Sequence, residues 1–169
     1  MSDPSPPSSP PELIAELRRT AGELSALLAE LPEERLAARP GDGGWSAAGV
    51  VAHLAQFEVL AGARIRMVLT LERPPLASMD QEEFNRRFGD LLPLDAALAL
   101  FELNRGVNCD LLARLEPADW DRPGLHPVRG EESLAKTVAM LARHDRDHLQ
   151  QFRAAAAGQG GSPRSPAEK

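Results

Sequence analysis

The chain has 169 residues, of which 43% are hydrophobic and 26% are charged, a balance typical of a soluble globular protein with one domain. Its net charge is -6, and it has two lysines, seven aromatic residues and no tyrosine. This composition argues against nucleic acid as a partner, because such binding depends on clustered basic side chains and on aromatic stacking. Polar residues interrupt every long apolar stretch, so we expect no membrane-spanning helix and no membrane partner.

Cysteine usage bears on the compartment. Cys109 is the single cysteine, which excludes an internal disulfide and agrees with a reducing environment. The first residues have neither the basic nor the apolar segment of a secretory signal. We therefore expect a cytoplasmic protein.

Prolines divide the chain into helix-length stretches. They crowd both ends, where we expect disordered tails over residues 1–8 and 158–169 around a folded body over 9–157. Within the body, apolar residues recur every three or four positions, as on one face of a helix. The pattern predicts four long helices, at about 10–31, 46–71, 94–116 and 133–157.

The connection between the second and third helices is long for a helical bundle. It covers about 20 residues from Arg73 to Leu92, and a capping-box pattern at Asp80 and Glu83 predicts a short helix at 81–88 within it. A connection of this length can cross the bundle and let the third helix run parallel to the second. No stretch shows a useful strand alternation, so the fold class is all-α, a four-helix bundle.

Three of the four histidines lie on apolar faces of these helices. His144 and His148 are four residues apart, so their side chains stack on one helix face, as in helical metal-binding pairs. His53 lies at about the same height if the second and fourth helices are antiparallel. The three could hold one divalent metal ion, or could be ordinary core residues. His126, between Leu125 and Pro127, is expected to be a loop histidine.

Two groups of residues resemble the two motifs of the DinB-like (YfiT-like) metalloenzyme superfamily. The first group is Trp45-Ser46, His53-Leu54 and Glu58, and the second is His144 and His148. The resemblance spans about residues 12–157. It implies an up-down-down-up four-helix bundle with a divalent metal bound by His53, His144 and His148. Homodimers in the family imply a homodimer here.

Such a site points to enzymatic chemistry. Imidazole ligands suit Zn, Ni or Fe, and three protein ligands leave positions open for water or substrate. The family includes transferases and isomerases that use low-molecular-weight thiols. The resemblance therefore implies a metal-dependent enzyme, either a thiol-dependent S-transferase or a hydrolase of a small electrophilic compound. The alternative is a non-catalytic metal-binding or stress-associated interaction module.

Four further residues are weaker candidates around this site. Asp145 occupies the position of the glutamate in the H-E-x-x-H zinc proteases, which makes it a candidate general base. Arg64 could bind an anionic substrate or form an interhelical ion pair. Asp147 and Gln151 could orient the histidine pair or simply lie on a solvated face. A fourth protein ligand, such as His126 or Asp145, would favour a structural metal site.

Overall fold

The computed structural model describes residues 9–41, 43–89 and 91–159. The tails predicted at 1–8 and, from residue 160 onward, at the C-terminal end lie outside the described residues. The described chain forms, in order, α1 (Pro10–Ala29), α2 (Glu33–Ala37), α3 (Ala47–Thr70), α4 (Gln81–Phe88), α5 (Leu94–Leu112), a 3-10 helix η1 (Pro117–Asp121), β1 (Pro123–His126), β2 (Gly130–Ser133) and α6 (Leu134–Ala156).

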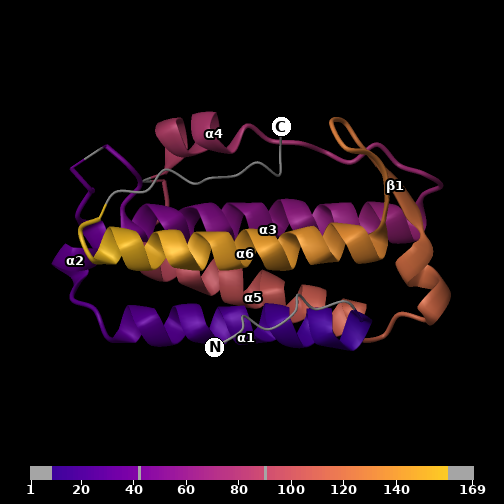
Figure 1. Ribbon diagram of the computed structural model, residues 1–169, viewed down its shortest axis with the longest axis horizontal. Coiled ribbons are helices and arrows are strands. Elements are labelled where there is room, and N and C mark those ends of the chain that lie inside the picture. Colours follow the sequence, from indigo (N-terminus) through magenta and orange to yellow (C-terminus); the bar gives the residue numbers. More distant parts are fainter. Residues whose placement is uncertain (1–8, 42, 90, 160–169) are drawn as a thin grey trace, which may run out of the picture.

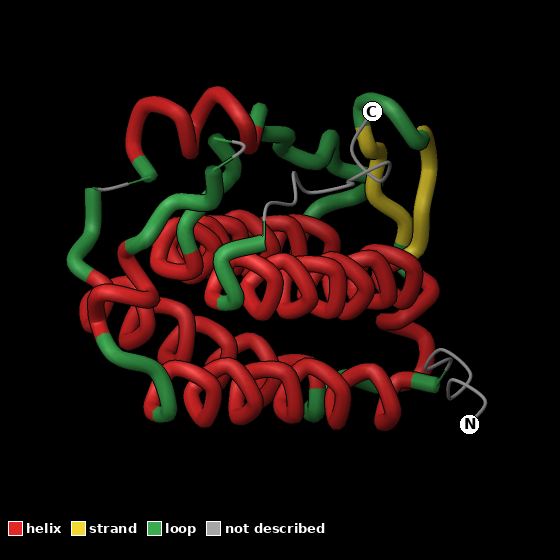
Figure 2. The backbone as a smooth tube through the Cα atoms, turned by 60° about the vertical axis from the view of Figure 1, so that its left-hand side comes forward, coloured by secondary structure: helices red, strands yellow, loops and turns green. Residues whose placement is uncertain are grey.

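The four long helices form a bundle with an up-down-down-up topology. α1 and α6 run in one direction, whereas α3 and α5 run in the other (Figure 1). α3 packs against α5 and α6, and α1 packs against the same two helices. The predicted fold class is therefore confirmed, with α3 and α5 parallel and the connection between them crossing the bundle. That connection contains α4, as predicted. Figure 2 shows α4 and the two strands on the same side of the bundle.

Side-chain caps begin several of the helices. Ser46 Oγ accepts a hydrogen bond from the Gly49 backbone N–H at 3.0 Å, Asp80 Oδ1 from Glu83 at 2.9 Å, and Ser133 Oγ from Lys136 at 3.2 Å. Each cap satisfies a donor that a helix N-terminus leaves without an intrahelical partner. These local signals explain why the sequence locates the helix starts so closely.

α5 ends four residues earlier than predicted. After Leu112 the backbone changes to bonds between residues three apart, from Arg114 N–H to Leu111 O and from Leu115 N–H to Leu112 O. This tighter pattern commonly closes a helix, and Pro117 then lacks the N–H that a continued helix would need.

The segment after α5 contains an antiparallel hairpin where the sequence pattern predicts a loop. β1 pairs with β2 from Pro123↔Ser133 to His126↔Gly130. The Leu125 N–H also donates to Pro74 O, and the Leu76 N–H donates to Leu125 O, both at 2.8 Å. The hairpin is therefore tied to the beginning of the crossover, a long-range contact that local periodicity does not encode. Gly130 turns the chain with a φ of 75°, which glycine adopts without strain.

A layer of polar side chains separates two apolar clusters along the bundle. One cluster includes Leu24, Phe101 and Phe152, and the other includes Leu17, Ile65 and Leu141. Between them lie seven buried polar residues, which we call the central polar layer: His53, Glu58, Arg105, Asn108, His144, Asp145 and His148. Buried charge is costly unless it is paired, so this layer calls for a specific explanation.

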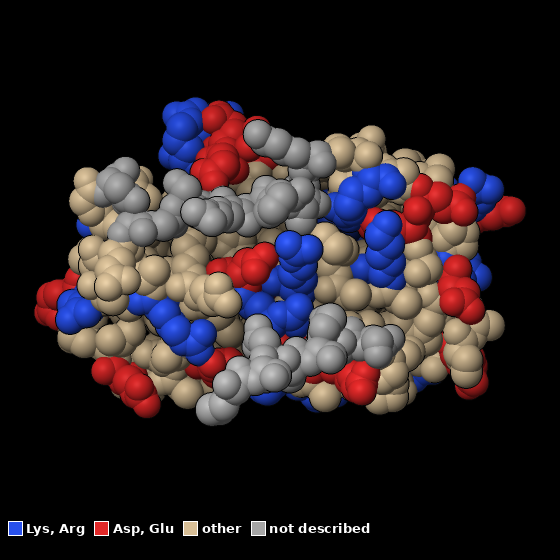
Figure 3. Space-filling model, in the orientation of Figure 1, with Lys and Arg blue, Asp and Glu red and all other residues tan. Residues whose placement is uncertain are grey.

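Ion pairs cross the outer seam between α1 and α6. Arg146 contacts Glu16 at 3.2 Å, and Arg153 contacts Glu23. On the face shown in Figure 3, basic and acidic side chains are interspersed. Both pairs are only partly shielded from solvent, which limits what each adds to stability, so the apolar clusters carry most of the packing.

Candidate metal centre

His53 on α3 and His144 and His148 on α6 converge in the central polar layer. The Nε2 atoms of His53 and His144 lie 3.0 Å apart. One ring nitrogen from each of the three residues lies within 4.8 Å of those of the other two. All three side chains are buried, with exposed fractions of 3%, 8% and 2%. The antiparallel packing of α3 and α6 thus brings the three candidates together, and their role as metal ligands stays a prediction.

The surroundings keep these imidazoles neutral. Burial lowers the pKa of His53 and of His144 well below the usual 6.5, and the neighbouring histidines lower it further. Burial also lowers the pKa of His148, whereas the hydrogen bond that His148 donates to Gln151 raises it. A neutral imidazole is the form that binds a metal ion, so the donors are ready at neutral pH.

Gln151 and Trp45 fix the ring of His148. Its Nδ1 lies 2.8 Å from Gln151 Oε1. Because an amide oxygen accepts hydrogen bonds, Nδ1 carries the proton and Nε2 keeps a lone pair that can bind a metal ion. The indole of Trp45 stacks on the same ring, with centroids 5.9 Å apart and planes 3° apart. Asp147 is exposed and lies 3.9 Å from Arg143. Of the two flanking candidates, Gln151 is thus the one in contact with the site.

Gln81, the first residue of α4, also reaches the cluster. Its Oε1 lies 3.4 Å from His144 Nε2. The crossover therefore places an amide beside the three imidazoles. Local sequence patterns do not predict this contact, because it depends on how the crossover folds back over α3 and α6.

A buried ion-pair network lies behind the histidines. Arg105 on α5 contacts Glu58 Oε2 through Nη2 and Asp145 Oδ2 through Nη1, both at 2.7 Å. Burial raises the pKa of both carboxyl groups, whereas Arg105 lowers it. Burial opposes the charge of Arg105, but Asp145 and Glu58 outweigh it and raise the pKa of the guanidinium. Asn108 Nδ2 also donates to Glu58 Oε1 at 2.8 Å.

Asp145 lies beside Nδ1 of His144, whereas the Nε2 atom of the same ring lies beside His53. Asp145 Oδ1 lies 3.6 Å from His144 Nδ1. Among the described residues, neither Asp145 nor His126 belongs to the cluster of converging donor atoms. His126 lies at the end of β1, where its Nδ1 accepts hydrogen bonds from the Val128 and Arg129 backbone N–H groups at 3.2 Å.

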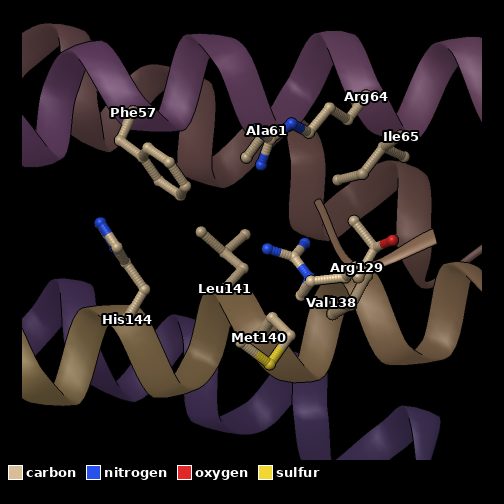
Figure 4. A pocket seen from close by; sticks show the side chains of 10 residues that line it. Phe57, Ala61, Arg64, Ile65, Arg129, Val138, Met140, Leu141 and His144 are labelled. Carbon is tan, nitrogen blue, oxygen red and sulfur yellow. The ribbon is translucent and has the colours of Figure 1, made fainter. Parts of the chain in front are cut away.

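A small pocket with ≈ 30 Å³ of space lies between α3 and α6 beside His144. Figure 4 shows Arg64 reaching into it from α3 and Arg129 from the segment before β2. Arg64 Nε donates to Ala77 O at 2.8 Å, and its guanidinium lies 5.6 Å from the centre of the Phe57 ring. Phe57 in turn stacks on His144, with centroids 3.9 Å apart. The sequence indicated Arg64 but not Arg129.

Within the described residues, no helix is both long and apolar enough to span a bilayer.

Comparisons with known proteins identify relatives of this chain. The family model of the DinB superfamily matches residues 16–152. A protein of Oceanobacillus iheyensis named "Putative metal-dependent hydrolase" is 30% identical over 138 residues, which cover 82% of this chain and 80% of that protein. A protein of the same name from Bacillus mycoides is 27% identical over 135 residues, which cover 80% and 78% of the two chains.

Solved structures share the fold. YfiT from Bacillus subtilis, described as a probable metal-dependent hydrolase with an unusual four-helix bundle topology, superimposes with a TM-score of 0.78 at 21% identity, over 94% of this chain and 95% of YfiT. A mycothiol-dependent maleylpyruvate isomerase superimposes with a TM-score of 0.66 at 17% identity, over 90% of this chain but 61% of the isomerase. With the extent of the family match and the identity to its relatives, we conclude that the chain belongs to the DinB superfamily.

Proposed function

We propose that this protein is a metal-dependent enzyme acting on a small electrophilic compound, with His53, His144 and His148 as the ligands of one divalent ion. The observation that carries the proposal is the convergence of three buried imidazoles from two helices on one point. Two Nε2 atoms only 3.0 Å apart are well placed to share one ion, since zinc lies about 2.0–2.1 Å from each nitrogen ligand.

The donor set fits a transition metal. Three neutral imidazoles suit Zn, Ni or Fe(II) better than Mg or Ca, which prefer oxygen ligands. Gln151 supplies the outer hydrogen bond that metal-bound histidines usually make through their second nitrogen. The bound ion would polarise a substrate oxygen, or lower the pKa of a water or a thiol.

A catalytic role is supported by the pocket. The converging donors among the described residues number three, as in catalytic zinc sites, whereas structural sites use four protein ligands. The pocket beside His144 leaves space against one of the three candidate ligands. A non-catalytic metal-binding module would need no such space.

Two reactions remain consistent with this arrangement. Hydrolysis is supported by the names of the relatives. Transfer to a low-molecular-weight thiol is supported by the fold shared with an enzyme that uses mycothiol. The expected cytoplasmic location and homodimer stay predictions.

The first experiment measures metal binding. The protein is purified without a histidine tag, stripped of metal and titrated with Zn²⁺ against a chromogenic chelator. We expect close to one equivalent for the wild type and loss of stoichiometric binding in His148→Ala, with helical content retained because the apolar clusters hold the bundle. His126→Asn is the matched control, since it removes a buried histidine outside the cluster and keeps an acceptor for the hairpin N–H groups.

Less than about 0.2 equivalents bound to the wild type, or full binding by His148→Ala, would refute the ligand assignment. The reaction class is then tested with the zinc-loaded protein. Release of product from esters or amides without a thiol indicates a hydrolase, whereas turnover of an electrophile only when a cellular thiol is added indicates a transferase. No turnover in either assay, at full metal loading, favours the non-catalytic module.

A further inference from the structure

The ring of His144 has one nitrogen beside His53 and the other beside Asp145. His144 Nδ1 and Asp145 Oδ1 lie 3.6 Å apart, and both atoms are buried without a hydrogen-bond partner among the described residues. Buried polar atoms in native proteins nearly always have a partner, because leaving one unsatisfied costs free energy. A displacement of roughly 0.5 Å would bring the two atoms within hydrogen-bond distance. A potential donor and an acceptor therefore face each other.

Other contacts hold both of these groups in place. Arg105 Nη1 contacts Asp145 Oδ2 at 2.7 Å, and Glu58 Oε2 holds the same guanidinium, also at 2.7 Å. Asp145 thus has one oxygen on the guanidinium and the other beside His144. The ring of Phe57 stacks on that of His144, with centroids 3.9 Å apart, which fixes the plane of the imidazole. The facing of Nδ1 and Oδ1 is therefore built into the packing of the bundle.

This arrangement distinguishes the two neutral forms of His144. With the proton on Nδ1, the ring presents a donor to the carboxylate. With the proton on Nε2, the Nδ1 lone pair faces the lone pairs of a buried carboxylate, which is unfavourable where water is excluded.

The contacts of His144 Nε2 are compatible with the first form. His53 can donate its own Nε2 proton across the 3.0 Å contact between the two rings. Gln81 Oε1 lies 3.4 Å from the same atom, and rotation of its amide exchanges this oxygen for the donor nitrogen. The carboxylate of Asp145 has no such freedom, because it can only accept. Asp145 therefore decides the position of the proton.

We propose that Asp145 is the positioning residue of His144, keeping the proton on Nδ1 and the Nε2 lone pair available to a metal ion. The proposal rests on the proposed function, which it deepens by naming the residue that prepares one ligand. Gln151 has the same effect on His148, so two candidate ligands carry the proton on Nδ1 before an ion binds. His53 differs from them, because its proton has to pass from Nε2 to Nδ1 when Nε2 binds the ion.

The test determines where each imidazole proton lies. Protein labelled with 15N-histidine is studied by NMR at about pH 8, where imidazoles are neutral, since ring nitrogens with and without a proton differ widely in chemical shift. In the metal-free wild type we expect the proton on Nδ1 of His144 and His148 and on Nε2 of His53. One equivalent of Zn²⁺ should change the tautomer of His53 alone.

Asp145→Asn should reverse the tautomer of His144. Arg105 only donates, so it retains the amide oxygen, and the amide N–H group then faces His144 Nδ1, which has to accept. The same replacement beside the catalytic imidazole of serine proteases gives the wrong tautomer. With Nε2 protonated, we expect zinc affinity, measured against a chelator of known affinity, to fall by at least about tenfold.

Glu58→Gln is the matched control. Glu58 contacts Arg105 at the same distance as Asp145 does, and each of the two carboxylate side chains is 1% exposed. The described side-chain hydrogen bonds of Glu58 come from Arg105 and Asn108 and not from a histidine. We therefore expect wild-type tautomers and a zinc affinity close to that of the wild type. Thermal unfolding shows that each variant is folded.

Three results would overturn the proposal. The first is a proton on Nε2 of His144 in the metal-free wild type, which is measured whether or not the variants fold. The others are an unchanged tautomer of His144 in Asp145→Asn and an equal change of tautomer in Glu58→Gln. A wild type that carries the His144 proton on Nδ1 but binds no zinc would support the role of Asp145 and refute the metal-dependent function.

Discussion

The Nδ1 atom of His148 and the Oε1 atom of Gln151 lie 2.8 Å apart, one turn along the same face of α6. Since an amide oxygen only accepts, the imidazole proton lies on Nδ1 and Nε2 keeps a lone pair. A single residue outside the candidate ligand set thus selects the tautomer that metal ligation through Nε2 would require.

Loss of this hydrogen bond should weaken metal binding. We expect Gln151→Leu to lower zinc affinity about 10–100-fold, the usual effect of removing an outer partner of a metal-bound histidine. Gln151→Glu should bind at least as well as the wild type, because a carboxylate accepts the same proton. Competition with a chelator of known affinity measures both variants.

Asp147→Asn is the control for that comparison, since Asp147 is exposed on the same helix. Its zinc affinity should stay close to that of the wild type. An equal loss of affinity in Asp147→Asn and Gln151→Leu would mean that general changes in α6, and not the tautomer of His148, set the affinity.

Stability of the metal-free protein should fall in acid. Burial lowers the pKa of all three imidazoles below 6.5, so below that pH the unfolded chain binds more protons than the folded one. The free energy of unfolding therefore decreases as the pH falls below 6.5, by up to about 1.4 kcal/mol per pH unit for each imidazole. Above pH 6.5 this contribution is constant.

The raised pKa values of Glu58 and Asp145 act in the opposite direction, since their folded forms take up protons first. The comparison of wild type with His148→Ala tests the imidazole contribution, because the variant removes one of the three buried imidazoles and keeps both carboxyl groups. Urea unfolding at several pH values between 8 and 5 should give a shallower acid loss for the variant. Identical slopes would show that His148 does not titrate as its burial implies. Zinc affinity of the wild type should also decrease as the pH falls through the lowered pKa values of the imidazoles, and an affinity that does not decrease in acid would contradict imidazole ligation.

Removal of Arg105 should destabilise the fold strongly. Arg105→Met leaves the carboxylates of Glu58 and Asp145 buried without their shared cation, and breaking a buried pair in this way costs about 3–5 kcal/mol. The triple variant that also carries Glu58→Gln and Asp145→Asn should recover part of this loss. Denaturant unfolding measures both.

The exposed pair of Arg18 and Asp110 provides the contrast. Arg18→Met removes the same type of side chain but should leave the unfolding midpoint almost unchanged, because solvent screens the pair. A large effect of Arg18→Met, or none of Arg105→Met, would be inconsistent with a network whose importance comes from burial.

Two helical glycines should respond to alanine with opposite signs. A Cβ on Gly62 would lie 2.8 Å from the Asn108 side chain, which Glu58 and Arg66 hold in place through hydrogen bonds. Gly62→Ala should therefore cost about 1–3 kcal/mol through overpacking between α3 and α5.

Gly106 is exposed on α5, and a Cβ there would meet nothing within 4 Å. Gly106→Ala should raise the free energy of unfolding by about 0.5–1 kcal/mol, because alanine loses less backbone freedom in a helix. Thermal or denaturant unfolding of the two variants checks the pair, and stabilisation by both would show that α3 and α5 are less closely packed than described.

The long helices and the histidine cluster were predictable because their signals are local. The caps at Ser46 and Ser133 fix where α3 and α6 begin, and the rise per residue then sets the heights of His53 and His148. The i, i+4 spacing of His144 and His148 needs only that α6 is helical. Antiparallel packing of two helices therefore suffices to predict the convergence.

The hairpin, α2 and the partners of the polar layer depend on tertiary contacts. β1 contains Pro123 and Gly124, which disfavour a strand by propensity, and the crossover pairs with it. α2 has five residues, too few for a periodic signal. Arg105 shows as a polar residue in an apolar stripe, but its choice of Glu58 and Asp145 depends on the order of four helices around the core.

His53 and His144 are 91 residues apart in the chain, and the crossover, α5 and the hairpin all lie between them. An isolated α6 peptide would retain two of the three imidazoles. The third, on α3, joins them only when α3 and α6 pack against each other. Closing a loop of this length costs conformational entropy. In the folded protein, the packing of the bundle offsets this cost. Ligation by all three would therefore act as a reversible cross-link, and release of the ion during unfolding would report the moment at which α3 and α6 separate.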